Sequence, residues 1–114
     1  MHLERFKLIV LDEARKFLKT LPLSVREKIY YNIRKVQGGV LDNELFKKLE
    51  NSVIWEFRTR YKGTAYRLFA FWDTETETLV VATHGIIKKT QKTPLKEIHK
   101  AEEIRRLYFN EKNH

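Results

Sequence analysis

The stretch of residues 53–73 constrains the fold of this chain more than any other. Its first part, VIWEFRTRY, alternates so that Trp55 and Phe57 point to one face of a strand, whereas Glu56 and Arg58 point to the other. A Lys-Gly turn separates it from a second aromatic-rich run, AYRLFAFWD. Two such runs joined by so short a turn predict an antiparallel hairpin with one charged face.

Two further strands are predicted around this hairpin. After the polar connection TETET, residues 79–86 read LVVATHGI, which is typical of a strand. Three consecutive strands with short connections predict an antiparallel meander. Near the start of the chain, FKLIVL at residues 6–11 is short and apolar and predicts another strand.

Two helices are predicted between the first strand and the meander. Asp12 is a suitable cap for the first, and Pro22 marks the break after it. Ser24 is a suitable cap for the second, with Glu27 three residues on as in a capping box. The apolar residues at helical spacing are Ala14, Phe17, Leu18 and Leu21 in the first helix and Val25, Ile29, Ile33 and Val36 in the second. Together they form a helical hairpin.

Two more segments have a helical period. Residues 40–51 place Leu45, Phe46 and Leu49 at spacings that predict a short helix starting after Asp42 or Asn43. Pro94 suits the first turn of a final helix with a partly apolar and heavily charged face.

The order of elements predicts an α+β fold of a strand, a helical hairpin, a mainly antiparallel three-stranded meander and a C-terminal helix. Helices segregated from the strands would cover one face of the sheet. The other face would then be exposed or occupied by a partner. A length of 114 residues predicts a single domain, residues 1–114.

Composition excludes several kinds of site. The chain has no cysteine, which excludes disulfides and thiolate chemistry, and its four histidines lack metal-ligand spacing. We therefore predict no metal and no other cofactor. Charges interrupt every apolar run before the roughly 18 residues that a bilayer span requires, and the amino terminus lacks the pattern of a signal peptide. We expect a cytoplasmic protein without a membrane partner.

The positive charge of the chain, +8 overall, lies mainly in two windows without acids. Residues 57–72 and residues 84–96 each carry four cations and no acid. The cations of the two windows are Arg58, Arg60, Lys62, Arg67, Lys88, Lys89, Lys92 and Lys96. Such a distribution favours a polyanion as partner, although a charge run is often only a solvated surface.

The residues leave few enzymatic reactions open. There is no phosphate loop, nucleophile elbow, HExxH motif or close carboxylate pair on the meander. What remains is attack of a ribose 2′-hydroxyl on the adjacent phosphorus without a metal, which needs cations around the developing charge and groups that move two protons. Arg58 and Arg67 are candidates for the cations because an arginine fork can bind two phosphate oxygens.

Other candidates for this chemistry each have a structural alternative. His84 is the one histidine in a predicted strand and can transfer protons near neutral pH, but it can equally be a hydrogen-bonded residue at a strand end. Glu56 is a candidate base or, more readily, an ion-pair partner of an arginine. Tyr66 and Trp72 are candidates for stacking on a base, although aromatic residues more often belong to the core.

Four short motifs occur in order along the second half of the chain: KKL at residues 47–49, WEFR at 55–58, YRL at 66–68 and KKTQKTP at 88–94. They lie within FKKLENSVIWEFRTRYKGTAYRLFAFW and VVATHGIIKKTQKTPLKEIHKA. Over about residues 45–102 the chain resembles the phage-derived HigB-like branch of the RelE/ParE toxin superfamily.

This resemblance implies a toxin of a type II toxin–antitoxin pair that enters the A site of the 30S ribosomal subunit and cuts mRNA there. It implies a curved, mainly antiparallel sheet and a cognate antitoxin, usually a small helix-turn-helix protein. By motif position, Arg67 matches the arginine at the phosphate, Arg58 a cation on the preceding strand, and Lys88 and Lys89 a further cation after the last strand. His84 lies near a position that serves as a base in some branches.

Around these catalytic candidates we expect the other cations of the two windows to bind RNA: Arg60, Lys62, Lys92 and Lys96. The resemblance also leaves other functions open. One is a non-enzymatic, ParE-like inhibitor that binds DNA gyrase, and another is an inactive relative that only binds RNA. The basic strands favour RNA cleavage, since an inhibitor that binds a protein has no need of them.

Overall fold

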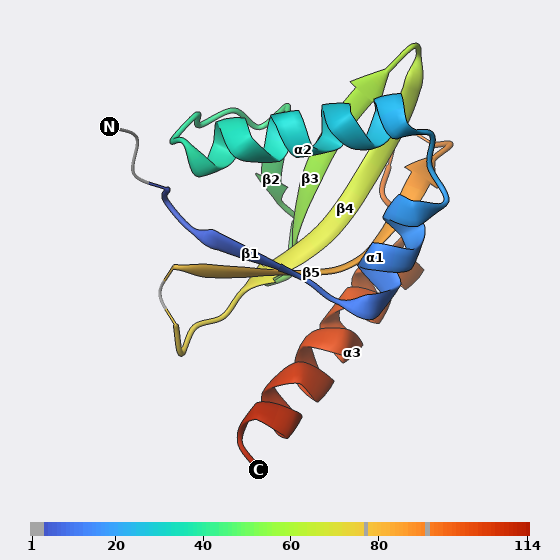
Figure 1. Cartoon of the computed structure of the whole chain (residues 1–114). Helices are drawn as coiled ribbons and strands as arrows, with labels where there is room; N and C mark the ends of the chain where they lie inside the picture. Colours follow the sequence, from blue (N-terminus) through green and yellow to red (C-terminus); the bar gives the residue numbers. More distant parts are fainter. Residues whose placement is uncertain (1–3, 77, 91) are drawn as a thin grey trace.

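The computed structural model describes residues 4–76, 78–90 and 92–114 (Figure 1). The elements are β1 (Lys7–Val10), α1 (Asp12–Lys19), α2 (Leu23–Gln37), β2 (Phe46–Lys48), β3 (Trp55–Tyr61), β4 (Thr64–Trp72), β5 (Leu79–Lys88) and α3 (Leu95–Lys112). None of the helices in these ranges is long and apolar enough to span a membrane. The predicted α+β fold, with its C-terminal helix, is confirmed.

The strands form a single five-stranded sheet in the order β1-β5-β4-β3-β2. β1 pairs with β5 in parallel, and all other pairs are antiparallel, so the predicted meander of β3, β4 and β5 is confirmed. Lys62 and Gly63 form the tight turn between β3 and β4, with φ of 49° and 81°. Positive φ at both turn residues matches the twist of the two strands, which explains why a Lys-Gly step closes this hairpin.

Helices α1 and α2 cover one face of the sheet, as the stripes of apolar residues predict (Figure 1). Leu18 of α1 and Ile29 and Ile33 of α2 pack with Phe57 and Leu68 of the hairpin in the larger core cluster. Gly85 of β5 lets α1 approach closely, because a Cβ at this position would lie 2.2 Å from the ring of Phe17.

Helix α3 lies against the opposite face, so the prediction that the helices cover only one face is wrong. Ile98 and Ala101 of α3 pack with Ile54, Phe71 and Val81 in a second apolar cluster. These sheet residues form an apolar patch that would otherwise be exposed, and burying it stabilises the docked helix.

The far end of α3 is fixed by a buried carboxylate. Asp73, at the end of β4, accepts a hydrogen bond of 2.7 Å from the Tyr108 hydroxyl and one of 2.6 Å from Lys112 Nζ. Burial and the neighbouring carboxylate raise the pKa of Tyr108 to about 12, so its hydroxyl stays a donor at neutral pH. The helix is therefore held at both ends of its apolar stripe.

The predicted helix within residues 40–51 is also wrong, because this segment forms a turn and the short strand β2. Phe46 pairs with Phe57 in the ladder, and the two rings stack with centroids 4.3 Å apart. The Arg58 backbone N–H donates to the Leu45 carbonyl at 2.8 Å. Pairing with the edge of the hairpin overrides a weak helical period in so short a segment.

The helices begin slightly differently from the prediction. The residues at the cap positions are Leu11, Pro22 and Pro94, and none of them makes a side-chain capping hydrogen bond. Asp12 is instead the first residue of α1, where an acidic side chain interacts favourably with the helix dipole. Ser24 lies inside the first turn of α2 and does not cap it.

Candidate nucleic-acid interface

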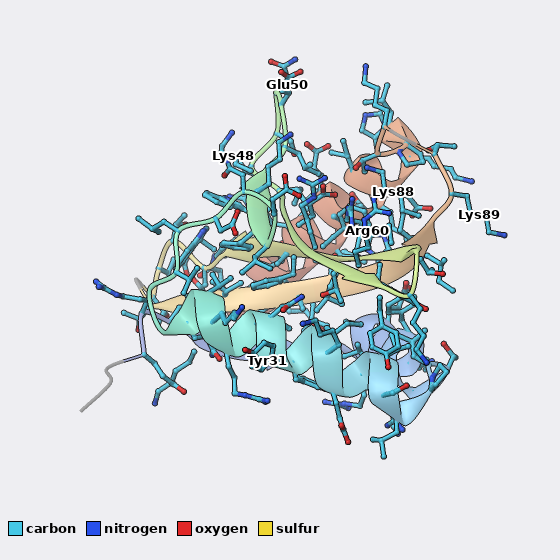
Figure 2. The ribbon with its side chains drawn as sticks, turned by 90° about the horizontal axis from the view of Figure 1, so that it is seen from above. Tyr31, Lys48, Glu50, Arg60, Lys88 and Lys89 are labelled. Atoms are coloured by element: carbon cyan, nitrogen blue, oxygen red, sulfur yellow. The ribbon has the colours of Figure 1, made fainter. Side chains whose placement is uncertain are left out.

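Helix α3 covers only part of the second sheet face, and the part that it leaves open is cationic. The register places Arg58 opposite Arg67, and Arg67 opposite Ile86. Two rows closer to the β3–β4 turn it places Arg60 opposite Ala65, and Ala65 opposite Lys88. Side chains directly opposite one another share a face, and so do those of alternate rows. Figure 2 shows Arg60 and Lys88 on this side of the sheet and Tyr31 of α2 on the other.

These rows line a cavity of about 280 Å³. Its lining residues are Arg58, Arg60, Gly63, Ala65, Arg67, Lys88, Lys89 and Thr90. Ala65, with only a methyl group, and Gly63, with no side chain, leave the space, and long basic side chains surround it. A cavity with this lining is suited to an anion, and its open mouth suits one that belongs to a larger molecule.

Arg58 and Arg67, which both line the cavity, share a carboxylate. Glu56 Oε1 lies 3.6 Å from Arg58 Nε and 3.4 Å from Arg67 Nε. Arg67 and Glu56 are buried, with 5% and 2% of their surfaces exposed, whereas Arg58 is half-buried. Burial lowers the pKa of Arg67, the charge of Glu56 raises it, and that of Arg58 lowers it further. The alternative of an ion-pair role for Glu56 is therefore the one that the geometry favours.

Lys88 closes the cavity from the last strand. Its side chain is half-buried, and burial together with the charges of Arg67, Arg58 and Lys47 lowers its pKa. Glu56 acts in the opposite direction. Lys88 is thus a lysine that releases its proton more readily than an exposed one, while its neighbour Lys89 is exposed.

The segment between β5 and α3 is tied to the arginine pair. The Thr93 hydroxyl donates to Glu56 Oε2 at 3.1 Å, although the two residues are far apart in the chain. Thr93 directly precedes Pro94, the cap residue of α3. One carboxylate therefore connects strands β3 and β4 with the segment that follows Lys88 and Lys89.

His84 does not line the cavity, although it was a candidate from the sequence. It is buried on the same face, where its ring stacks on Phe69 with centroids 4.8 Å apart. Nε2 donates to Glu97 Oε1 at 3.1 Å, which leaves Nδ1 of the neutral ring to accept from the Thr83 hydroxyl at 3.0 Å. Burial lowers the pKa of His84 against the effect of Glu97. The hydrogen-bonded structural alternative describes this environment.

The remaining candidates lie around the cavity or away from it. Lys62 is exposed on the β3–β4 turn, and Lys92 and Lys96 are exposed beyond β5 without lining the cavity. Tyr66 and Trp72 pack against the core beneath α1 and α2, on the opposite sheet face. Their environment is therefore that of core residues.

Lys47 is a cation at this site that we did not single out from the sequence. In the register it lies opposite Glu56, on the cationic face, and its charge contributes to the lowered pKa of Lys88. The motif KKL contained the residue, but a helix was predicted there. Assigning these residues to a strand paired with β3 would have placed Lys47 beside Glu56.

Comparisons with known proteins agree with this architecture. A family model described as "Phage derived protein Gp49-like (DUF891)" matches residues 16–106. The structure is similar to that of a mutant of the E. coli toxin RelE in the free state, with a TM-score of 0.59 and 18% sequence identity, covering 86% of this chain and 93% of that one. The comparison with curated proteins finds no match. The family model thus assigns the chain to the Gp49-like family of phage-derived proteins, and the likeness to the solved toxin shows a shared fold.

Proposed function

Because the chain belongs to the Gp49-like family of phage-derived proteins, we propose that it is the toxin of a toxin–antitoxin pair and cleaves mRNA on the ribosome. The observation that carries this proposal is the cavity in which Arg58, Arg60, Arg67, Lys88 and Lys89 converge on one open sheet face. The RelE-like fold supports it, since the solved relative is itself named a toxin. The HigB-like branch predicted from the motifs is part of the same proposal.

The proposed reaction is an internal transesterification of RNA. The ribose 2′-oxygen attacks the adjacent phosphorus, the bond from phosphorus to the 5′-oxygen breaks, and the proton of the 2′-hydroxyl leaves while the 5′-oxygen gains one. Negative charge grows on the phosphoryl oxygens during this step, and Arg67 with Arg58 stabilises it. Lys88 and Lys89 add further positive charge at the mouth of the cavity.

Dependence on the ribosome follows from what the cavity offers. Its lining presents cations, and Glu56, the carboxylate beside the arginine pair, is engaged by two arginines and Thr93. A site with charge stabilisation but no disengaged base gains most when its substrate is already held in line for attack. The A site of the 30S subunit would hold mRNA in that way, while Arg60, Lys62, Lys92 and Lys96 contact the surrounding RNA.

The proposed partner in the cell is a cognate antitoxin, expected to be a small helix-turn-helix protein. An acidic surface or segment of the antitoxin would bind the same cationic face, because the charges are opposite, and the bound antitoxin would exclude RNA. Induced expression of the chain in the cytoplasm is then toxic, and expression together with the antitoxin is not.

Cleavage of mRNA on purified translating ribosomes tests the proposal. The wild-type chain is expected to cut ribosome-bound mRNA, and Arg67→Ala is expected to lower the rate about 10²–10³-fold, as for loss of one oxyanion donor. Arg106→Ala is the matched control, because Arg106 is exposed on α3 and, among the residues that the structure describes, pairs only with Glu103. Intact mRNA together with inhibited DNA supercoiling would replace this proposal by a gyrase inhibitor. RNA binding without either effect would indicate the inactive relative.

A further inference from the structure

A buried carboxylate beside two of the arginines that line a cationic cavity needs an explanation, because it partly neutralises the charge that an anion would bind. We propose that Glu56 is a positioning residue, which orients Arg58 and Arg67 toward a phosphate and fixes the segment after β5. The inference rests on the proposed function for its meaning in catalysis. The geometry that suggests it is independent of that function.

Each arginine of the pair is held at two points. Nε of each faces Glu56 at an ion-pair distance, 3.6 Å for Arg58 and 3.4 Å for Arg67, without forming a hydrogen bond there. Nη1 of Arg58 donates to the Asn43 carbonyl at 3.0 Å, and Nη1 of Arg67 donates to the Tyr66 carbonyl at 3.2 Å. Both guanidinium groups are thereby fixed from the protein side.

The same arrangement leaves one nitrogen of each arginine for a ligand. Within the described residues, neither Arg58 Nη2 nor Arg67 Nη2 has a protein acceptor. Both arginines line the cavity, and they are direct neighbours in the ladder between β3 and β4. Two nitrogens offered side by side can bind two oxygens of one phosphate group.

The charge of Glu56 stabilises the pair of adjacent arginines and still leaves the cavity positive. Arg58 lies close enough to Arg67 that its charge lowers the pKa of Arg67. Glu56 offsets that repulsion from the Nε side of both. One carboxylate against the five cations that line the cavity still leaves a strongly positive site.

The second oxygen of Glu56 extends the effect to the following segment. Oε2 accepts from the Thr93 hydroxyl at 3.1 Å, so Thr93, the residue before the cap of α3, is attached to the arginine pair. Without this bond, Lys88 would keep its place in β5, but the start of α3 would lose its connection to the pair. Glu56 thus holds the arginines of β3 and β4 together with the residue at the start of α3.

The test compares Glu56→Gln with Glu44→Gln. Glu44 is exposed, and its charge also acts on Arg67, but within the described residues the ion pairs of both arginines are with Glu56 and not with Glu44. Both variants therefore remove one negative charge near the pair, and only Glu56→Gln releases the guanidinium groups. Thr93→Val removes the hydroxyl bond alone, and thermal unfolding checks that each variant is folded.

On the ribosome, Glu56→Gln is expected to lower kcat about 10- to 100-fold, as small misplacements of catalytic groups do. KM, and the Kd for a 2′-deoxy mRNA that cannot be cut, should stay equal or fall, because the site has lost a negative charge. Thr93→Val should lower kcat less, and Glu44→Gln should leave it unchanged. A wild-type kcat in folded Glu56→Gln, an equal effect of both glutamate variants, or weaker RNA binding in Glu56→Gln overturns the inference.

A second measurement separates this inference from the proposed function. Restricted rotation of the two guanidinium groups should give separate Nη–Hη NMR signals for Arg58 and for Arg67 in the wild type. Those signals should broaden in Glu56→Gln and persist in Glu44→Gln, whether or not the chain cuts RNA. Unchanged signals in Glu56→Gln contradict the positioning role, whereas a wild-type chain that leaves ribosome-bound mRNA intact contradicts only the proposed reaction.

Discussion

Replacing Gly85 by alanine tests how closely α1 packs on the strand that carries Lys88. A Cβ at Gly85 would lie 2.2 Å from one ring carbon of Phe17 and 2.9 Å from the first carbon of the ring, so the whole ring must move. Forcing a methyl group into such packing costs about 1–3 kcal/mol. The backbone of Gly85 does not have positive φ, and the substitution therefore adds no backbone strain.

A double-mutant cycle with Phe17→Ala tests this prediction further, because the effect of Gly85→Ala on the free energy of unfolding should change sign when the ring is absent. Phe17→Ala alone should cost up to about 3 kcal/mol, since the ring is only partly buried. Once the ring is gone, Gly85→Ala should be neutral or stabilise by about 0.5–1 kcal/mol, because alanine loses less conformational entropy in a strand than glycine. The two substitutions should therefore couple by roughly 1–4 kcal/mol.

Urea unfolding of the wild type, both single variants and the double variant measures the coupling, provided that the m-values agree. Additive changes in the free energy of unfolding, with Gly85→Ala equally harmful in both backgrounds, would refute the close approach of α1 and β5. Such a result would also weaken the placement of β5, and with it the position of Lys88 in the cavity.

Two predictions concern groups whose pKa is shifted. Cleavage that depends on the charge of Lys88 should decline as pH rises, and because the pKa of Lys88 is lowered, this decline should begin at a lower pH than for an ordinary lysine. Lys88→Arg should shift the decline to higher pH in a pH–rate profile, because arginine keeps its charge. Superimposable profiles of the wild type and Lys88→Arg contradict the role of Lys88. Because the pKa of His84 is lowered below 6.5, the unfolded chain binds the additional proton as pH falls through 6.5, and stability drops from there down to the folded pKa. His84→Asn should remove this acid-dependent part in urea unfolding at pH 5 and 7.5, and an unchanged difference contradicts it.

The part of the fold that the sequence predicts well is the part with strong local signals. The alternation around Trp55 and Glu56 spans a whole strand. Between two such strands, the Lys-Gly step predicts a tight hairpin turn. The two N-terminal helices have stripes of four apolar residues each. In these segments the local preference and the tertiary structure agree, so a pattern in one short window suffices.

The errors occur where a distant partner decides the structure. Phe46 belongs to a strand only because Phe57 stacks on it and the hairpin offers an open edge. The final helix lies on the second face because Ile98 and Ala101 find Phe71 and Val81 there. Neither contact can be predicted from the sequence of the segment itself. A three-residue strand is too short to show a period, and the apolar stripe of a helix does not indicate which face of the sheet it will cover.

The candidate site shows the same limit in its chemistry. The sequence identifies Arg58 and Arg67 as cations on neighbouring strands. That they lie directly opposite each other follows only when the strands are paired symmetrically about the two-residue turn, with Tyr61 opposite Thr64. Two like charges in that position repel each other, and a sheet that keeps them there needs a compensating group. Glu56 is two residues before Arg58 in the same strand, so its side chain lies on the same sheet face and can supply the compensating charge. From the hairpin alone one can therefore infer that WEFR supplies both a phosphate-binding cation and the carboxylate that holds it in place, and the Glu56→Gln experiment tests that inference.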